Sequence, residues 1–297
     1  MIKSKITRMR IITALFCLVC SVIALAADAN NMIIEKDVAY LPAGRAEKLD
    51  LYMPSDVNSA GDLPLVIFIH GGAWKGGDKL NPQTKNIAAT LVENGYICAS
   101  INYLLGTEQK PAWPQNLIDC KAAVVFLKKN AKKYNIDPNH IGAIGASAGA
   151  HLVAMLALTA QENLPDTPPP DKKYPPAVQA AVGLYGVYDF PTFEGREKYT
   201  KSLFSAKDFN DPQAWRMLSP LSHISANAPP FLLIHGSADN TVSQSQSIKF
   251  NEKLKAQKLD STLLIVEGAP HSFALTPKQK DLRPVVINFF DKHLKRK

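Results

Sequence analysis

The sequence predicts an α/β fold with a mainly parallel central sheet of about eight strands and helices on both faces. Unbroken apolar runs such as PLVIFIH at 64–70 are typical of strands that are buried on both faces of a sheet. Stretches with apolar residues at helical spacing separate these runs, and this alternation favours βαβ units. The chain of 297 residues is 46% hydrophobic, which is enough for a full core.

The predicted elements follow one another from residue 33 to the end of the chain. The expected strands are 33–41, 47–53, 64–70, 96–104, 140–146, 178–187, 230–236 and 261–268. The expected helices are 82–94, 114–135, 148–160, 243–257 and 279–295. The first two strands are expected to form a hairpin. IDPNH at 136–140 is predicted as a turn, 161–176 as a loop, and 188–228 as an irregular segment without a clean period.

The first 26 residues have the three parts of a secretory signal peptide. Four basic residues precede an apolar run over 11–24, and Ala24 and Ala26 occupy the two positions that a signal peptidase reads. The run is short for a membrane span, so an uncleaved anchor is the less favoured alternative. We therefore expect a signal peptide at 1–26, a single domain at 27–297, a periplasmic or secreted protein, and no stable membrane span after cleavage.

Charge and cysteine content restrict the expected partners. Removing the four basic residues of the signal peptide takes the net charge from +8 to +4, and no basic run with interleaved aromatic residues is present, so nucleic acid is not an expected partner. The mature chain keeps Cys98 and Cys120. Two buried free thiols are favoured, with one disulfide as the alternative. No pair of histidines has zinc-ligand spacing backed by acids or thiols, so neither a metal nor another cofactor is expected.

A Gly-x-Ser-x-Gly motif, formed by Gly145, Ser147 and Gly149, follows the predicted strand at 140–146. The pattern is that of a nucleophile elbow, where a tight strand-to-helix turn strains the serine backbone and leaves no room for a Cβ two residues before or after it. Taken alone, the motif also fits a serine that only caps the following helix. A dinucleotide or phosphate loop fits less well, because neither the G-x-G-x-x-G spacing nor a Lys-Ser/Thr pair is present.

The predicted strand at 64–70 runs into the sequence HGGAW at 70–74. Glycines at a strand end let backbone N–H groups point into a cavity, where such donors stabilise the oxyanion that forms during ester hydrolysis. The N–H of Ala148, which follows the serine, would complete this oxyanion hole. A plain glycine-rich turn is the alternative. We expect Trp74 to line the pocket edge and bind substrate, and His70 to be structural.

Two later strand ends supply a candidate acid and a candidate base. Asp239 follows the strand at 230–236, and His271 follows the strand at 261–268. A serine hydroxyl is a poor nucleophile at neutral pH and needs a base that a carboxylate orients. Both residues stand in the chain order serine, acid, histidine that is typical of this chemistry on an α/β sheet. Asp189 is the reserve acid.

The remaining histidines are weaker candidates for the base than His271. We expect His151 to pack in the helix after Ser147 and His235 to belong to its own turn. His140 and His223 are expected in loops, and His293 in an exposed tail.

On these motifs the chain resembles the α/β-hydrolase superfamily, and more narrowly the bacterial esterases related to feruloyl esterases and to the hormone-sensitive-lipase group. The matching stretches lie between about residues 48 and 273 and include PLVIFIHGGAWKGGDK, IDPNHIGAIGASAGAHLVAMLALT, APPFLLIHGSADNTV and EGAPHSF. The resemblance implies that Ser147 is the nucleophile, His271 the base and Asp239 the orienting acid. It implies an oxyanion hole formed by the backbone amides of Gly72, Ala73 and Ala148.

Four positions depart from the family's usual pattern. Ala150 stands where a second glycine is common, Leu104 where an arginine is often found, and Ser243 where a proline is common. Pro270 directly precedes the base. None of these departures removes a catalytic group, but Leu104 and Pro270 are expected to alter the pocket.

The favoured function is a secreted serine carboxylic-ester hydrolase that works through an acyl-enzyme. Short-chain acyl esters or acetyl and feruloyl esters of plant polysaccharides are the substrates that the resemblance implies, so the expected partner is a small-molecule or carbohydrate ester. An amidase, arylformamidase or peptidase on the same fold is one alternative. A non-catalytic binding module is another, although such modules usually lose a catalytic residue. The oligomeric state stays open.

Overall fold

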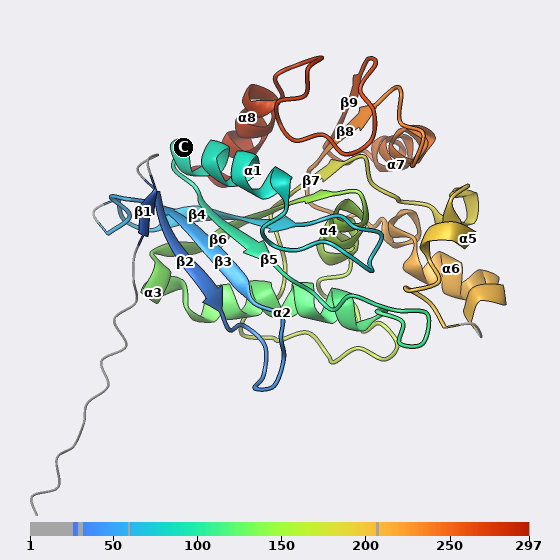
Figure 1. Cartoon of the computed structure of the whole chain (residues 1–297), viewed down its shortest axis with the longest axis horizontal. Helices are drawn as coiled ribbons and strands as arrows, with labels where there is room; N and C mark the ends of the chain where they lie inside the picture. Colours follow the sequence, from blue (N-terminus) through green and yellow to red (C-terminus); the bar gives the residue numbers. More distant parts are fainter. Residues whose placement is uncertain (1–25, 29–31, 59, 206–207, 297) are drawn as a thin grey trace, which may run out of the picture.

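The computed structural model describes residues 26–28, 32–58, 60–205 and 208–296, and within them one nine-stranded sheet forms the centre of the molecule (Figure 1). Its strands are β1 (Ala26–Asp28), β2 (Met32–Val38), β3 (Leu49–Pro54), β4 (Leu63–Ile69), β5 (Ile97–Ile101), β6 (Ile136–Ala146), β7 (Ala180–Leu184), β8 (Phe231–Gly236) and β9 (Ser261–Val266). The predicted fold class is confirmed, and β1 is the only one of these strands that was not predicted. The predicted signal peptide lies outside the described residues, apart from Ala26.

Strand directions divide the sheet into an antiparallel edge and a parallel remainder. The spatial order is β1-β2-β3-β5-β4-β6-β7-β8-β9. The pairs β1–β2, β2–β3 and β3–β5 are antiparallel, which confirms the predicted hairpin of β2 and β3. From β5 to β9 all neighbours are parallel. The carboxyl ends of β4, β6, β8 and β9 therefore meet at one edge, where an α/β sheet usually carries its site.

Helices cover both faces of this sheet (Figure 1). They are α1 (Pro82–Glu93) and α8 (Arg283–Leu294) on one face, and α2 (Gln115–Lys129), α4 (Ala148–Leu158) and α7 (Ser245–Ala256) on the other. β4 shows how the sheet separates two cores, because Val66 and Phe68 join the core beneath α1 and α8 while Leu65, Ile67 and Ile69 join the other. No helix in the described ranges is long and apolar enough to cross a membrane.

The helix predicted at 114–135 is interrupted after Lys129. It resumes as the short helix α3 (Ala131–Tyr134). Asn130 stands at the break, and its side-chain amide donates to the carbonyl oxygen of Phe126 at 2.8 Å. An asparagine side chain that binds nearby backbone in this way competes with the regular helical ladder.

The prediction of a turn at 136–140 was wrong, because these residues form the first part of β6. Ile136 pairs with Leu63, whereas Ile141 pairs with Leu65, so a bulge accommodates the residues between them. Asp137 stabilises the bulge by accepting a hydrogen bond from the backbone N–H of Asn139 at 3.0 Å. Periodicity could not reveal this strand, because a bulge breaks the alternation on which strand prediction depends.

In its described residues, the irregular segment predicted at 188–228 contains several very short helices. They are η1 (Phe190–Thr192), α5 (Arg196–Tyr199), η2 (Asp208–Asn210), α6 (Pro212–Leu218) and η3 (Pro220–His223). Each is too short to display a hydrophobic period, which explains the sequence pattern. Aromatic rings hold the segment together, because Trp215 packs against Phe190, Phe204 and Phe209. In Figure 1, α5 and α6 lie at the right of the molecule.

The expected thiols are confirmed, but the expected places of three histidines were wrong. Cys98 and Cys120 are both free and buried, and they belong to different cores, so the sheet separates them. His293 is not in an exposed tail, because it belongs to α8, packs on Phe289 and keeps a side chain that is only 13% exposed. His223 lies in η3 rather than in a loop. His140 lies in β6.

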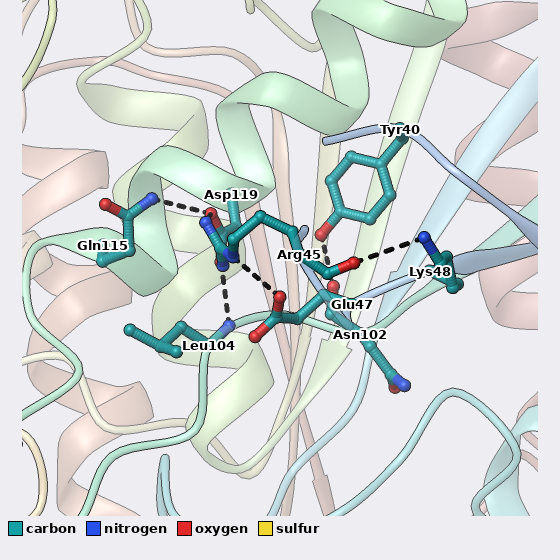
Figure 2. A network of polar contacts seen from close by, with 8 residues as sticks. All are labelled: Tyr40, Arg45, Glu47, Lys48, Asn102, Leu104, Gln115 and Asp119. Carbon is teal, nitrogen blue, oxygen red and sulfur yellow. Dashed lines mark hydrogen bonds and ion pairs between the residues drawn. The ribbon is translucent and has the colours of Figure 1, made fainter. Parts of the chain in front are cut away.

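A polar network around Asp119 joins the β2–β3 connection to α2 (Figure 2). The guanidinium of Arg45 binds the buried Asp119 carboxylate through two hydrogen bonds, of 3.1 and 2.6 Å. The side chain of Gln115 and the backbone N–H of Leu104 donate to the same carboxylate at 2.8 and 2.9 Å. Arg45 and the backbone of Leu104 therefore meet at the same carboxylate.

We predict that Arg45→Leu destabilises the protein by about 3 kcal/mol, because it leaves the buried carboxylate of Asp119 without its cation. Chemical denaturation would measure the change in free energy of unfolding. The matched control is Arg283→Leu, since Arg283 and its partner Asp281 are both exposed and such a surface ion pair contributes little to stability. Equal effects of the two substitutions would contradict the importance given to the Asp119 network.

Candidate active site

Ser147 occupies a strained turn between β6 and α4. Its backbone has φ 54° and ψ −118°, a conformation that a residue with a Cβ adopts only at a cost. The backbone N–H of Ser147 donates to the carbonyl oxygen of Leu184 at 2.9 Å, which ties the turn to β7. A Cβ on Gly145 would collide with the backbone of Gly149, and one on Gly149 would collide with the carbonyl oxygen of Ile69. The two glycines of the motif are therefore required sterically.

The backbone around HGGAW turns beside Ser147. Gly72, Ala73 and Trp74 all have positive φ values, of 127°, 51° and 57°. Gly72 and Ala73 line the same cavity as Ser147, and so does Ala148. Ala148 is the first residue of α4, so its N–H has no acceptor within the helix and lies at the positive end of the helix dipole. The predicted oxyanion-hole residues are thus brought to one cavity.

The loop at 102–106 holds the HGGAW turn in place through two hydrogen bonds. The hydroxyl of Tyr103 donates to the carbonyl oxygen of His70 at 2.9 Å, and the N–H of Gly106 donates to that of Trp74 at 2.9 Å. His70 itself is buried and stacks on Tyr103 with ring centroids 4.5 Å apart, which agrees with the structural role expected for it. Because Leu104 of this loop binds Asp119, the network of Figure 2 reaches the turn beside Ser147.

A second set of contacts fixes the chain after this turn. Lys79 is buried, and its ammonium group forms a 2.8 Å ion pair with the buried carboxylate of Asp50. The backbone N–H of Lys79 donates to Asn102, and its carbonyl oxygen accepts from Ser100 at 2.7 Å. The chain between His70 and Lys79 is therefore held at both ends by hydrogen bonds or ion pairs to neighbouring segments.

The three predicted triad residues form one continuous chain of hydrogen bonds. The Nε2 atom of His271 lies 3.0 Å from the Oγ atom of Ser147. Its Nδ1 atom lies 2.6 Å from Oδ2 of Asp239. The His271 ring is 14% exposed and packs against the edge of Tyr185 at a centroid distance of 4.7 Å. Asp239 rather than Asp189 contacts the base, while the Asp189 carboxylate accepts from the hydroxyl of Thr192 at 2.6 Å.

The Asp239 carboxylate is buried but well supplied with hydrogen-bond donors. Oδ1 accepts from the backbone N–H groups of Thr241 and Val242, at 2.8 and 2.9 Å. Oδ2 faces His235 as well as His271, with its distance to Nε2 of His235 at 3.2 Å. Burial alone raises the pKa of Asp239, but the hydrogen bonds from His235 and His271 outweigh it and hold the pKa well below its usual range.

His235 thus has a contact that the sequence did not reveal, because it lies against the candidate acid. It is fully buried, and its Nε2 atom also lies 2.9 Å from the carbonyl oxygen of Val242. Its Nδ1 atom lies 2.7 Å from the hydroxyl of Ser247. Two acceptors near Nε2 indicate that Nε2 carries a proton. The sequence offered one signal for this contact, which is that His235 lies only four residues before Asp239.

His151 packs inside the molecule, as expected, and it holds Trp74. The indole N–H of Trp74 donates to Nδ1 of His151 at 3.0 Å, and Nε2 of His151 lies 2.9 Å from the carbonyl oxygen of Leu218. Complete burial lowers the pKa of His151 to about 3, so the ring is neutral. The contact with Leu218 links α4 to the irregular segment after β7.

A cavity of about 360 Å³ contains Ser147 and His271. Trp74 lines it, as predicted, although the indole is almost wholly buried. Phe193 and Tyr199 of the irregular segment also line it, and no sequence pattern had singled them out. Leu104 and Pro270, which were expected to alter the pocket, are not among the lining residues.

These features define an α/β-hydrolase with a serine at its nucleophile elbow. Residues 49–254 match the model of a protein family described as BD-FAE. The chain belongs to this BD-FAE family. The matched range includes Ser147 and Asp239 and ends before His271.

Curated relatives match most of the chain. Esterase LipQ of Mycobacterium tuberculosis (strain ATCC 25618 / H37Rv) is 34% identical over 261 residues, which are 85% of this chain and 61% of that protein. Esterase LipC of the same organism is 33% identical over 242 residues, 77% of this chain and 58% of that protein. The chain therefore spans about three fifths of the length of these relatives.

Solved structures share the fold. A truncated form of a carbohydrate esterase from gut microbiota superposes with a TM-score of 0.74 at 23% identity, over 90% of this chain and 98% of that one. An acetyl ester-xyloside bifunctional hydrolase from Caldicellulosiruptor lactoaceticus superposes with a TM-score of 0.72 at 25% identity, over 84% of this chain and 89% of that one.

The neutral state of His151 generates a prediction about pH. In the folded protein the ring resists protonation down to a pKa of about 3, whereas in the unfolded chain it titrates near about 6.5. The unfolded state therefore binds more protons below about pH 6.5, and the folded state loses stability as the pH falls. Between about pH 7 and pH 5 this loss is about 2 kcal/mol from His151 alone.

Denaturation curves of the wild type and of His151→Gln at both pH values would check this. The variant should be less stable at about pH 7 but should lose about 2 kcal/mol less on acidification, because glutamine does not titrate. Parallel losses in the two proteins would show that His151 is not the group that resists protonation.

Proposed function

We propose that the protein is a secreted serine carboxylic-ester hydrolase that acts through an acyl-enzyme. The observation that carries this proposal is the hydrogen-bonded chain from Ser147 through His271 to Asp239, which opens into a cavity lined by three candidate oxyanion donors. The relatives named above are esterases, and they support the reaction class.

In the first half of the reaction, Ser147 attacks the ester carbonyl. Nε2 of His271 takes the Oγ proton as the new bond between Oγ and the carbonyl carbon forms. The carbonyl oxygen becomes an oxyanion, which accepts hydrogen bonds from the backbone N–H groups of Gly72, Ala73 and Ala148. The bond to the alcohol oxygen then breaks, and His271 gives its proton to the leaving alcohol.

In the second half, water releases the acid. His271 takes a proton from a water molecule, whose oxygen attacks the acyl carbon, and the same donors hold the second oxyanion. The bond to Oγ breaks, and the proton returns from His271 to Ser147. Asp239 stays ionised throughout and stabilises the imidazolium that forms twice. Its low pKa is consistent with that task.

The cavity supports an acyl group with apolar surface on the substrate. Trp74, Val187 and Val242 are among the residues that line it, so the apolar part of an acyl group can pack there. Acetyl or feruloyl esters of plant polysaccharides are the proposed natural substrates, and the 25% identical acetyl ester-xyloside hydrolase supports the acetyl class. The sequence at 1–26 supports export of the enzyme.

We predict that Ser147→Ala leaves only the residual catalysis of the oxyanion hole and of binding, about 10³–10⁴-fold over water. Hydrolysis of p-nitrophenyl acetate measures this loss, and Ser225→Ala, an exposed serine outside the cavity, is the matched control. A Ser147→Ala enzyme that works near the wild-type rate would exclude the mechanism.

Two further measurements separate the alternatives. A p-nitrophenyl ester compared with the matched p-nitroanilide distinguishes an esterase from an amidase, arylformamidase or peptidase, and we expect the ester to be far preferred. An organophosphonate should label Ser147 in the folded protein, because it reports an activated serine. Failure of both labelling and hydrolysis would favour a non-catalytic binding module.

Export also has a direct test. When the full chain is expressed in a bacterium with a periplasm, the recovered protein should begin at Ala27, because Ala24 and Ala26 form the proposed cleavage site. N-terminal sequencing of the protein from the periplasmic fraction measures this. An intact N-terminus on a membrane-bound product would instead support the uncleaved anchor.

A further inference from the structure

A second hollow opens beside the catalytic cavity and shares part of its wall. It has a volume of about 470 Å³ and lies between the segment after β7 and the loop after β8. Phe193, Tyr199 and Thr241 line both hollows, so the second hollow lies directly beside the cavity that contains Ser147. We name the second hollow the polar groove.

The side chains of the polar groove differ in kind from those around Ser147. They carry hydroxyl, amide and charged groups, in place of the apolar wall of the cavity. These side chains are Thr192, Glu194, Lys198, Asn240, Ser243 and Gln246. Together they offer both donors and acceptors over a short distance.

Three of these groups are available to a ligand. Glu194, Lys198 and Asn240 are exposed, and within the described part of the chain no hydrogen bond or ion pair engages their side chains. The ammonium of Lys198 lies 5.0 Å from the centroid of the Tyr199 ring. Tyr199 in turn stacks on Phe193 at a centroid distance of 6.2 Å, so an aromatic pair stands where the two hollows join.

The floor of the groove is held in place by Gln246 of α7, which is buried. Its side-chain oxygen accepts from the backbone N–H groups of Tyr188 and Asp189, at 2.9 and 2.8 Å. Its side-chain nitrogen donates to the carbonyl oxygen of Asp189 at 3.0 Å and lies 3.3 Å from the hydroxyl of Thr192. The opposite wall is the loop that carries Asp239. The floor of the groove and the loop of Asp239 are therefore fixed before a ligand binds, which lowers the entropic cost of binding.

We infer that the polar groove binds the sugar part of a neutral acetylated oligosaccharide, while the acetyl group enters the apolar cavity. This inference rests on the esterase function proposed above and adds where the alcohol side of the substrate lies. A sugar presents hydroxyls that donate and accept, and Asn240, Lys198 and Glu194 provide matching partners. Its C–H faces pack on an aromatic ring, and Tyr199 provides one.

The charges of the groove favour a neutral ligand over a charged one. Lys198 and Glu194 carry opposite charges at the same hollow, and the Asp239 carboxylate that also lines it is buried and already bound by His235 and His271. Neither an anion nor a cation therefore gains a field of one sign from the exposed groups. A long apolar alcohol would leave these polar groups without water or partners, which is costly. A polyhydroxy alcohol satisfies them.

The test compares one ester with a sugar and one without. The double variant Lys198→Ala with Asn240→Ala removes two groups that line only the polar groove. Its matched control is Lys201→Ala with Asn227→Ala, two exposed residues outside both hollows. The substrates are acetylated xylo-oligosaccharides and p-nitrophenyl acetate.

For the acetylated oligosaccharides we expect kcat/KM of the double variant to fall about 10-fold or more, mostly through KM, because two hydrogen bonds to the sugar are lost. The loss on p-nitrophenyl acetate should be about 3-fold at most, and the control variant should follow the wild type on both. Unacetylated xylotriose should also inhibit wild-type hydrolysis of p-nitrophenyl acetate competitively, with an inhibition constant that rises about 10-fold in the double variant.

Equal losses on both substrates, or unchanged inhibition by xylotriose, would overturn the assignment of the groove. A wild type that hydrolyses p-nitrophenyl acetate but not the acetylated oligosaccharides would overturn it as well, and would leave the esterase function standing. Wild-type protein that hydrolyses neither substrate would remove the esterase function and the groove assignment together.

Discussion

The left-handed backbone of Ser147 is the constraint on which the rest of the site depends. A residue with a Cβ keeps such a conformation only when its surroundings over-determine it. Here β6 ends in the middle of a parallel sheet, and only Ser147 separates it from the start of α4. Gly145 and Gly149 let the backbones of the strand and the helix touch. The result is a serine hydroxyl held above the strand ends, with the N–H of Ala148 free at the helix start. Everything else in the site is arranged around that hydroxyl.

Buried aspartates hold the loops that surround this serine. Asp119 receives Arg45 and the N–H of Leu104, and thereby fixes the loop that supports the HGGAW turn. Asp50 binds Lys79 at the far end of that turn. Asp239 receives two backbone N–H groups as well as its histidines. In each case a desolvated carboxylate is costly unless its partners stay in place, so the loops have little freedom to move. The oxyanion donors and the base gain their fixed geometry from this arrangement.

Local sequence was enough to predict the framework and the candidate triad. Buried strands appear as apolar runs, and the elbow must have small residues on both sides of Ser147, so both leave a signal within a few positions. Asp239 and His271 followed from their places directly after strands, because parallel strands bring their carboxyl ends to one edge. The bulge that begins β6 escaped prediction, since it interrupts the alternation that marks a strand.

The sequence by itself determined the sheet, the elbow and the chain order of serine, acid and histidine, because short-range sterics and strand periodicity encode them. Only the tertiary structure decided which side chains complete the site. Arg45 meets Asp119 across 74 positions of sequence, and no local pattern links them. Phe193 and Tyr199 come from a segment whose helices are too short to show a period, yet they border both the cavity and the polar groove. Such contacts depend on how distant segments pack, and packing is a property of the folded chain as a whole.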